Sequence, residues 1–252
     1  MRIVRACLRD GRGGSPTAVL DDDGAFTDAE RRAVPGRAGT SHAVFIGAGN
    51  VLRFFTSAGE LPACGHGTVA ALAVLAGQGR EVTLRAGGRT FAGWVEADGE
   101  LYRAAFDPGP VSLRAPSAEE AGPVLAALGV GEPAGAPCVA SVGRERLLVP
   151  VAGRAVLAGL APDQERLRAA CDAIGMLGCY VYTIPEPGGR AAARMFAPSI
   201  GVPEDIANAN STACLAARLG REVAVDMGDA LGEPATVVAS ARRVGGLAKT
   251  LS

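Results

Sequence analysis

Short apolar runs separated by turn residues make up most of the first half of the chain. Runs that carry β-branched or aromatic residues and are bounded by Gly, Asp or Pro are typical of strands. Such runs occur at residues 2–8, 17–20, 42–46, 51–56, 81–85, 89–95 and 101–106. Residues 68–76 (TVAALAVLA) differ, because they are apolar nearly all round. That pattern is typical of a helix buried on every side, as inside a barrel.

The second half follows the same order of patterns. Residues 117–128 and 162–175 are predicted to form surface helices. Strand-like runs are found at 138–151, 179–183 and 194–196, followed by a polar segment at 205–212, a second short apolar helix at 213–219 and further strands. Each half therefore has strands, a Gly- or Asn-rich turn and a short apolar helix. This repeat predicts two pseudo-equivalent lobes.

A stretch rich in Pro, Gly and Ser at residues 107–117 separates the two halves, and such residues are common in linkers. We expect an N-terminal lobe over residues 1–112 and a C-terminal lobe over residues 113–252. This division leaves open whether the terminal strand crosses back to the first lobe. A chain of 252 residues can bury a substantial core as one large domain or as two smaller ones.

Composition narrows the class of function. The net charge is −1, the 25 basic residues are scattered, and aromatic residues make up only 4%. A nucleic-acid-binding surface needs a basic stripe, so we expect a small-molecule ligand and no nucleic acid. No apolar run approaches the roughly 20 residues that cross a bilayer, and no signal-peptide pattern follows Met1. These features predict a cytoplasmic protein with no membrane partner.

The six cysteines show neither CxxC pairs nor the spacing of a zinc site. A chain of this length does not need disulfides for stability. We therefore expect reduced, mostly buried cysteines and no metal site.

The turns before the two apolar helices carry the candidate chemistry. The first, ELPACGHGT at residues 60–68, exposes backbone N–H groups at a helix start, where anions bind. It includes His66, which can exchange protons near neutral pH. The second, EDIANANST at residues 204–212, offers Asp205 with several amide and hydroxyl groups. Either turn could instead be structural, because Asn, Ser and Thr are good helix caps. The other histidine, His42, lies at a strand start.

Several segments resemble the PhzF-like isomerases, a branch of the diaminopimelate-epimerase-like proteins. They are GSPTAV (14–19), RFFTSAGELPACGHGT (53–68), RLLVPV (146–151), LAPD (160–163), RMFAP (194–198) and GVPED (201–205). The resemblance implies an α+β diaminopimelate epimerase-like fold with two pseudo-symmetric lobes, each a mixed, barrel-like sheet around a central helix. It also implies a homodimer without a cofactor, and an active site between the lobes.

The family's catalytic groups are a Glu in a strand, the His of ACGH, the Asp of an EDPATGS motif and the Ser that ends that motif. His66 and Asp205 match this pattern, but the Glu position is His42 and the Ser position is Asn210. We expect His42, His66 and Asp205 to be catalytic. The expected substrate-binding residues are Ser41, Cys64, Gly65, Gly67, Asn208, Ala209, Asn210 and Ser211.

Three interpretations of His42 remain open. Imidazole could replace the carboxylate as the shuttling base, because its unperturbed pKa of about 6.5 lies nearer to neutral pH than the value of about 4.3 for Glu. His42 could instead bind a different substrate while another group moves the proton. It could also be a hydrogen-bonded strand residue in an inactive site. A racemase with two facing thiols is disfavoured, because the position that would face Cys64 is Asn208.

The favoured hypothesis is a cofactor-independent isomerase that shifts a double bond by proton transfer in a small unsaturated carboxylate. A pyrroline carboxylate in alkylproline-unit biosynthesis, a branch of secondary metabolism, is one such substrate, suggested by resemblance alone. The alternatives are a phenazine-type dihydro-hydroxyanthranilate isomerase, an amino-acid epimerase and an inactive small-molecule binder.

Overall fold

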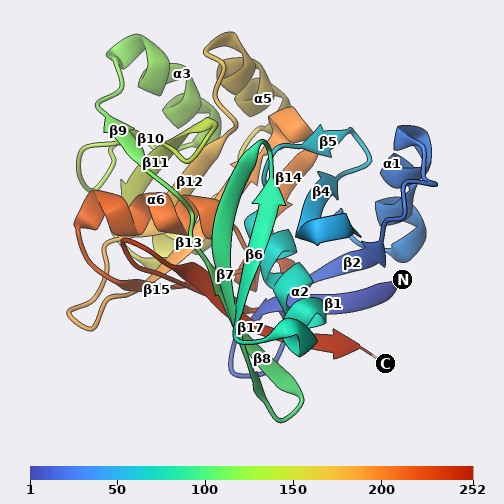
Figure 1. The fold of residues 1–252 in the computed structure, drawn as a ribbon. Coiled ribbons are helices and arrows are strands. Elements are labelled where there is room, and N and C mark those ends of the chain that lie inside the picture. Colours follow the sequence, from blue (N-terminus) through green and yellow to red (C-terminus); the bar gives the residue numbers. More distant parts are fainter. Residues whose placement is uncertain (252) are drawn as a thin grey trace.

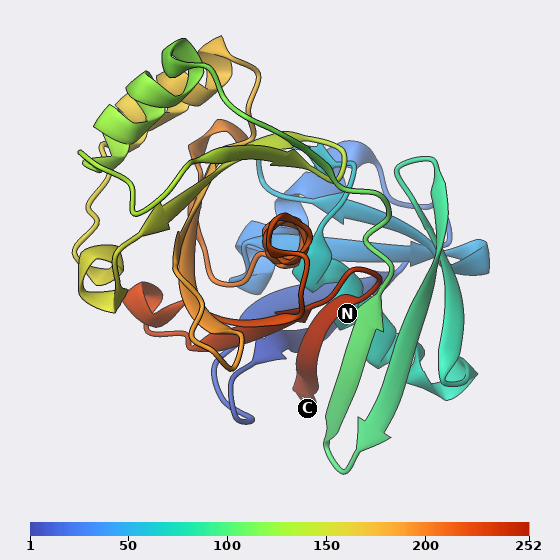
Figure 2. The same ribbon diagram turned by 90° about the vertical axis from the view of Figure 1, so that its left-hand side faces the viewer.

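Each half of the molecule wraps a mixed β-sheet around one buried helix. The computed structural model describes residues 1–251. The two enclosed helices are α2 (Gly65–Leu75) and α6 (Ala209–Leu219), and most of their residues are buried. Figure 2 shows α6 end-on inside a ring of strands. The α+β fold with a helix inside each barrel-like sheet, expected from the sequence, is confirmed.

Figure 1 labels most of the elements and colours them in the order of the chain. The strands are β1 (Arg2–Leu8), β2 (Ser15–Asp21), β3 (His42–Gly47), β4 (Val51–Phe55), β5 (Glu60–Leu61), β6 (Glu81–Ala86), β7 (Arg89–Asp98), β8 (Leu101–Phe106), β9 (Ser112–Arg114), β10 (Cys138–Ser141), β11 (Glu145–Val151), β12 (Cys179–Thr183), β13 (Arg190–Ala197), β14 (Val202–Asp205), β15 (Val223–Met227), β16 (Ala235–Ala239) and β17 (Val244–Leu251). The other helices are α1 (Asp28–Ala38), α3 (Ala118–Leu128), α4 (Arg154–Ala158) and α5 (Gln164–Ala173).

A closed ring of strands surrounds α2. Strands β1 and β2 pair antiparallel, β2 and β3 parallel, and β3 and β4 antiparallel. Strand β6 lies parallel to β4, and β6, β7 and β8 form an antiparallel meander. Strand β17, from the end of the chain, pairs antiparallel with both β8 and β1 and so closes the ring.

The second half repeats this order of pairings around α6. Strands β10 and β11 pair antiparallel, β11 and β12 parallel, and β12 and β13 antiparallel. Strand β15 lies parallel to β13, and β15, β16 and β17 form an antiparallel meander. Strand β17 thus belongs to the meander of the second half while it completes the ring of the first. The division into lobes at residue 112 stays a prediction.

One continuous apolar core fills the interior of both rings and includes residues of α2 and α6. A second cluster lies outside the second sheet, where α3 and α5 pack against each other and cover β11 and β12 (Figure 1). A smaller third cluster lies between α1 and strands β2, β3 and β4. All six cysteines are buried and unpaired. Within residues 1–251, no helix combines the length and the apolar character needed to cross a membrane.

The sequence prediction missed α1 and placed two helix starts too late. The α1 segment, DAERRAVPGRA, is mostly polar and contains Pro35, so its apolar pattern is weak, yet a capping box between Thr27 and Glu30 starts it. Helix α2 starts at residue 65 rather than 68, and α6 at 209 rather than 213. The Gly, Asn and Ser residues before each apolar run are typical of turns, but in the structure they form the first turns of α2 and α6. His66 and Asn210 therefore lie inside the first turns of their helices.

Leu72, at the centre of α2, tests the importance of the enclosed helix. Its side chain is fully buried, so Leu72→Ala removes core contacts and leaves a cavity. We expect this substitution to lower the free energy of unfolding by about 2 to 5 kcal/mol, measured by urea denaturation. Leu231→Ala is the matched control, because Leu231 is 42% exposed, and it should change stability by less than about 1 kcal/mol. Equal losses in the two variants would contradict the assignment of α2 to the core.

Candidate active site

The starts of α2 and α6 touch each other. A Cβ atom placed on Gly65 would lie 2.6 Å from the Cβ of Ala209 and 3.1 Å from the backbone N of Asn210. Real Cβ atoms do not approach so closely, so only glycine at position 65 allows this contact. The contact brings two helix N-termini, each with a partial positive charge, to one place.

Both helix starts leave backbone N–H groups without side-chain caps. Cys64, the N-cap residue of α2, makes no side-chain cap hydrogen bond. Asn208, the N-cap residue of α6, accepts one hydrogen bond from the backbone N of Ser211 at 2.9 Å. Unpaired N–H groups and the helix dipoles together favour an anion at such a position.

A cavity of about 210 Å³ opens beside this contact. The expected site residues that line it are His42, Cys64, Gly65, His66, Asp205, Asn208 and Asn210. They come from strand β3, the turn before α2, the end of β14 and the turn before α6. The structure therefore brings together residues that are up to 168 positions apart in sequence, from His42 to Asn210.

The remaining expected site residues do not line the cavity. Ser41 lies behind His42, with its Oγ 2.9 Å from His42 Nδ1. Gly67 packs beside Val44 and Phe54, and the Ser211 Oγ donates to the Met195 sulfur at 3.5 Å. Ala209 contributes the contact with Gly65 described above. These four residues can support the site, but the geometry gives them no direct contact with the cavity. The assignment of site residues stays a prediction.

His42 and His66 lie in direct contact. Their ring centroids are 4.4 Å apart and the rings are nearly perpendicular, at 84°. The residues are only 3% and 2% exposed. Two imidazoles this close cannot both be protonated without strong repulsion in a buried site. One is therefore expected to be neutral when the other carries a charge.

The surroundings move the pKa values of the two histidines in opposite directions. Burial lowers the pKa of His42 well below its usual value of 6.5, and the neighbouring His66 lowers it further. Burial also disfavours protonated His66, but the Cys64 sulfur and the Asp205 carboxylate outweigh this and raise its pKa to about 10. His42 is then a neutral base at pH 7, while His66 is a cationic acid.

Asp205 helps to orient and charge His66. Its Oδ2 lies 3.9 Å from His66 Nδ1, which donates a hydrogen bond to the Ala207 carbonyl at 2.9 Å. That bond fixes a proton on Nδ1, and Nε2 faces the Cys64 sulfur. The Asn208 amide donates to Asp205 Oδ2 at 3.0 Å. Burial raises the pKa of Asp205, and the charge on His66 opposes this.

The Cys64 thiol completes the cluster around His66. Its sulfur lies 3.5 Å from His66 Nε2. Ligand atoms of His42, Cys64 and His66 all lie within 4.8 Å of one another. Nitrogen and sulfur atoms are ligands that Zn²⁺ prefers, although its bonds of 2.0 to 2.3 Å would require the three to move closer together. The absence of a metal from the reaction stays a prediction.

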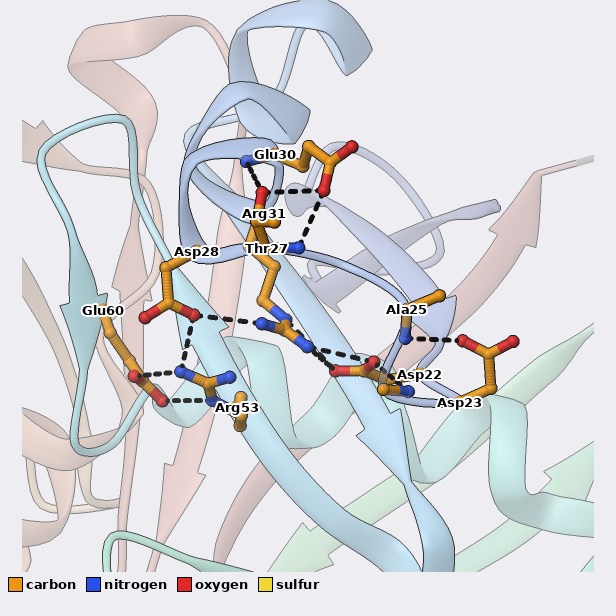
Figure 3. A network of polar contacts seen from close by, with 10 residues as sticks. Asp22, Asp23, Ala25, Thr27, Asp28, Glu30, Arg31, Arg53 and Glu60 are labelled. Atoms are coloured by element: carbon orange, nitrogen blue, oxygen red, sulfur yellow. Dashed lines mark hydrogen bonds and ion pairs between the residues drawn. The ribbon is translucent and has the colours of Figure 1, made fainter.

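A network of charges holds the strand that leads into the first turn (Figure 3). Arg53 donates two hydrogen bonds to Glu60, at 2.8 and 2.6 Å, and a third to Asp28 at 3.0 Å. Arg31 bridges Asp28 and the buried Asp22. These contacts link α1 to β4 and β5. They hold the start of the segment at residues 53–68, which resembles the PhzF-like isomerases.

The sequence prediction missed the cationic side chains of the cavity. Arg89, Arg144 and Arg146 also line it, together with Asp107. Arg146 directly precedes the apolar run LLVPV in the segment that resembles the family, and this position at the start of a buried strand is the available signal. Arg89 comes from β7 and Arg144 from a turn, and no sequence pattern marks either residue as part of a site.

NMR titration can test the separation of the two pKa values directly, because His42 and His66 are the only histidines. We expect His66 to lose its proton only near pH 10, and His42 to stay neutral until the pH falls well below 6.5. The signs follow from burial, which disfavours the charged ring, and from the anionic neighbours of His66, which favour it. His42→Gln and His66→Gln assign the signals. Two titrations near pH 6.5 would contradict this description of the site.

Comparison with known proteins shows the family of the chain. A family model described as phenazine biosynthesis-like protein, PhzC-PhzF, matches residues 8–244. An uncharacterized isomerase of Deinococcus radiodurans is 30% identical over 83% of this chain and 72% of its own. An uncharacterized isomerase of Escherichia coli is 28% identical over 82% of this chain and 74% of its own.

Solved structures show the same fold. A predicted epimerase of Pseudomonas aeruginosa superposes with a TM-score of 0.84 at 24% identity, over 100% of this chain and 96% of that one. A PhzF-family protein of Bacillus anthracis superposes with a TM-score of 0.82 at 17% identity, with the same coverage.

Proposed function

The chain belongs to the PhzC-PhzF family of phenazine biosynthesis-like proteins, and on this basis we propose that it is a cofactor-independent isomerase that moves a double bond in a small unsaturated carboxylate. The observation that carries the proposal is the pair of touching imidazoles with oppositely shifted pKa values. Groups whose environments push their pKa values apart are suited to act as base and acid in one reaction.

The two helix starts bind the substrate carboxylate in this proposal. The starts of α2 and α6 lie side by side because Gly65 touches Ala209 and the backbone of Asn210. A carboxylate bound in the cavity beside Gly65 and Asn210 would neutralise the positive ends of both helix dipoles, which gives a fixed orientation to the rest of the molecule. Asn210, which lines the cavity, donates a further hydrogen bond from its side chain.

His42 removes the proton from carbon. Its Nδ1 lies 2.9 Å from Ser41 Oγ. In the tautomer that we propose, Nδ1 donates to this hydroxyl and the lone pair on Nε2 is available as the base. When the C–H bond breaks, its electron pair enters the conjugated system and extends toward the carboxylate. The same proton returns from Nε2 to the far carbon, and the double bond has then moved with no net gain or loss of protons. A general base of this kind contributes about 10² to 10⁴ in rate.

His66 and Asp205 stabilise the charge that develops. Protonated His66 lies against the base and can stabilise the negative charge of the intermediate. Asp205 keeps His66 protonated and, through Asn208, is linked to the cap of α6. The acid, the base and the carboxylate site therefore meet around one small space.

The cavity limits the size of the substrate. Its volume of about 210 Å³ is below the range of about 300 to 1,000 Å³ that is usual for drug-sized ligands. A five-membered ring such as a pyrroline carboxylate of secondary metabolism, on the way to an alkylproline unit of an antibiotic, is the substrate that we propose to test first. We also propose that the protein is cytoplasmic and forms a homodimer.

An epimerase is the second candidate, supported by the contact between the Cys64 sulfur and His66 Nε2. In this alternative the Cys64 thiol and one imidazole act as the two bases. The reaction inverts one carbon atom and leaves every double bond in place.

Deuterium incorporation separates the two candidates. The protein, treated with EDTA, is incubated in D₂O with pyrroline-2-carboxylates that differ in double-bond position, and the products are analysed by NMR. Under the isomerase proposal the double bond moves. His42→Gln should lower the turnover by about 10²- to 10⁴-fold. His42→Glu, which restores the carboxylate of the resembling family, should retain more activity than His42→Gln.

Gln78→Ala is the control variant, because Gln78 is an exposed residue after α2 and does not line the cavity. Its activity should equal that of the wild type. Label uptake with inversion and no bond shift would identify the epimerase. A His42→Gln variant with normal turnover would exclude His42 as the base.

A further inference from the structure

Arg146 is a buried cation without a carboxylate partner. It lies in β11, is 2% exposed, and lines the same cavity as His42 and Asp205. Its Nη2 donates to the Arg144 carbonyl at 2.8 Å, and its Nη1 lies 3.8 Å from the Cys214 sulfur. Its Nε has no hydrogen-bond partner. Among residues 1–251, no carboxylate lies within ion-pair distance of this guanidinium.

Two other arginines with little exposed side chain, one buried and one partly buried, are paired with carboxylates. Arg31 forms an ion pair with Asp22 at 2.9 Å, and Arg194 forms one with Glu204 at 2.7 Å. A buried charge without a partner is costly, so proteins pair such groups or bind a ligand with them. Burial lowers the pKa of Arg146 from its usual value, in keeping with the missing counter-charge. Of these three arginines, the one without a carboxylate partner is Arg146, which lines the cavity.

Arg146 lies at a distance from the two helix starts. Its contact, Cys214, comes four residues after Asn210 on α6, which corresponds to about 6 Å along the helix axis. Arg146 therefore contacts α6 about one turn beyond its start, which gives the cavity a second place for negative charge besides the helix starts.

We propose that Arg146 binds a second acidic group of the substrate, so that the substrate is a small unsaturated dicarboxylate. One carboxylate binds at the helix starts and the other at the Arg146 guanidinium, with the conjugated carbons beside His42 between them. The Nε–H and an Nη–H can donate in parallel to one carboxylate, as arginine commonly does. This inference rests on the proposed function, because it assumes that the cavity is the substrate site.

Binding of diacids and their half-amides tests the proposal without turnover. The probes are fumarate, glutaconate and isophthalate, each compared by calorimetry with the monoamide that lacks one charge. We expect the wild type to bind at least one diacid about 10- to 150-fold more tightly than its monoamide, because a hydrogen-bonded charge pair is lost. Arg146→Met should remove this preference. If no diacid is preferred, or if Arg146→Met keeps the preference, the proposal is wrong.

Thermal stability separates a ligand-binding role from a structural one. Arg146→Met replaces an unpaired buried charge by an apolar side chain, so the melting temperature of the ligand-free protein should stay equal or rise. Arg194→Met is the matched control and should melt at a lower temperature, because it leaves Glu204 buried without its partner. A clear fall in the melting temperature of Arg146→Met would indicate a structural role and overturn the proposal.

The two proposals can fail separately. Diacid preference without any double-bond shift or deuterium exchange would reject the isomerase and keep the Arg146 site. A double-bond shift in monocarboxylates, with no diacid preference, would reject the Arg146 site alone.

Discussion

The contact between Gly65 and Ala209 is the constraint on which the site depends. It places the starts of two enclosed helices against each other, so that uncapped N–H groups from both halves face one space. Two like partial charges in contact are unfavourable without an anion, and for this reason we propose that the junction binds a carboxylate. Each ring of strands holds one of the two helices in position. Strand β17 joins the rings, because it pairs with β1, β8 and β16.

Burial affects the pKa values of the two histidines in different ways. The same exclusion of water that lowers the pKa of His42 strengthens the attraction between His66 and its anionic neighbours. Both effects come from side chains of the site itself. Arg146 also lines the cavity, and its buried positive charge has no carboxylate partner. We propose that a ligand neutralises this charge.

Much of the architecture could be predicted from the sequence, because the two apolar helices and the strand pattern are local signals. The approach of His42 to His66 and Asp205 could be expected only from the family resemblance, since no local pattern relates residues so far apart. Helix α1 escaped prediction because its buried residues, among them Arg31 and Pro35, are not apolar in a helical period. Arg146 escaped because its missing partner is visible only when the whole surroundings are known.

A crystal structure of the protein with sorbate, a conjugated carboxylate, would test the central claim most directly. The account predicts carboxylate oxygens at about 2.7 to 3.2 Å from backbone N–H groups of both helix starts, with the diene carbons facing the His42 ring. A carboxylate bound away from the contact of Gly65 with Ala209, or a diene that does not face His42, would contradict it.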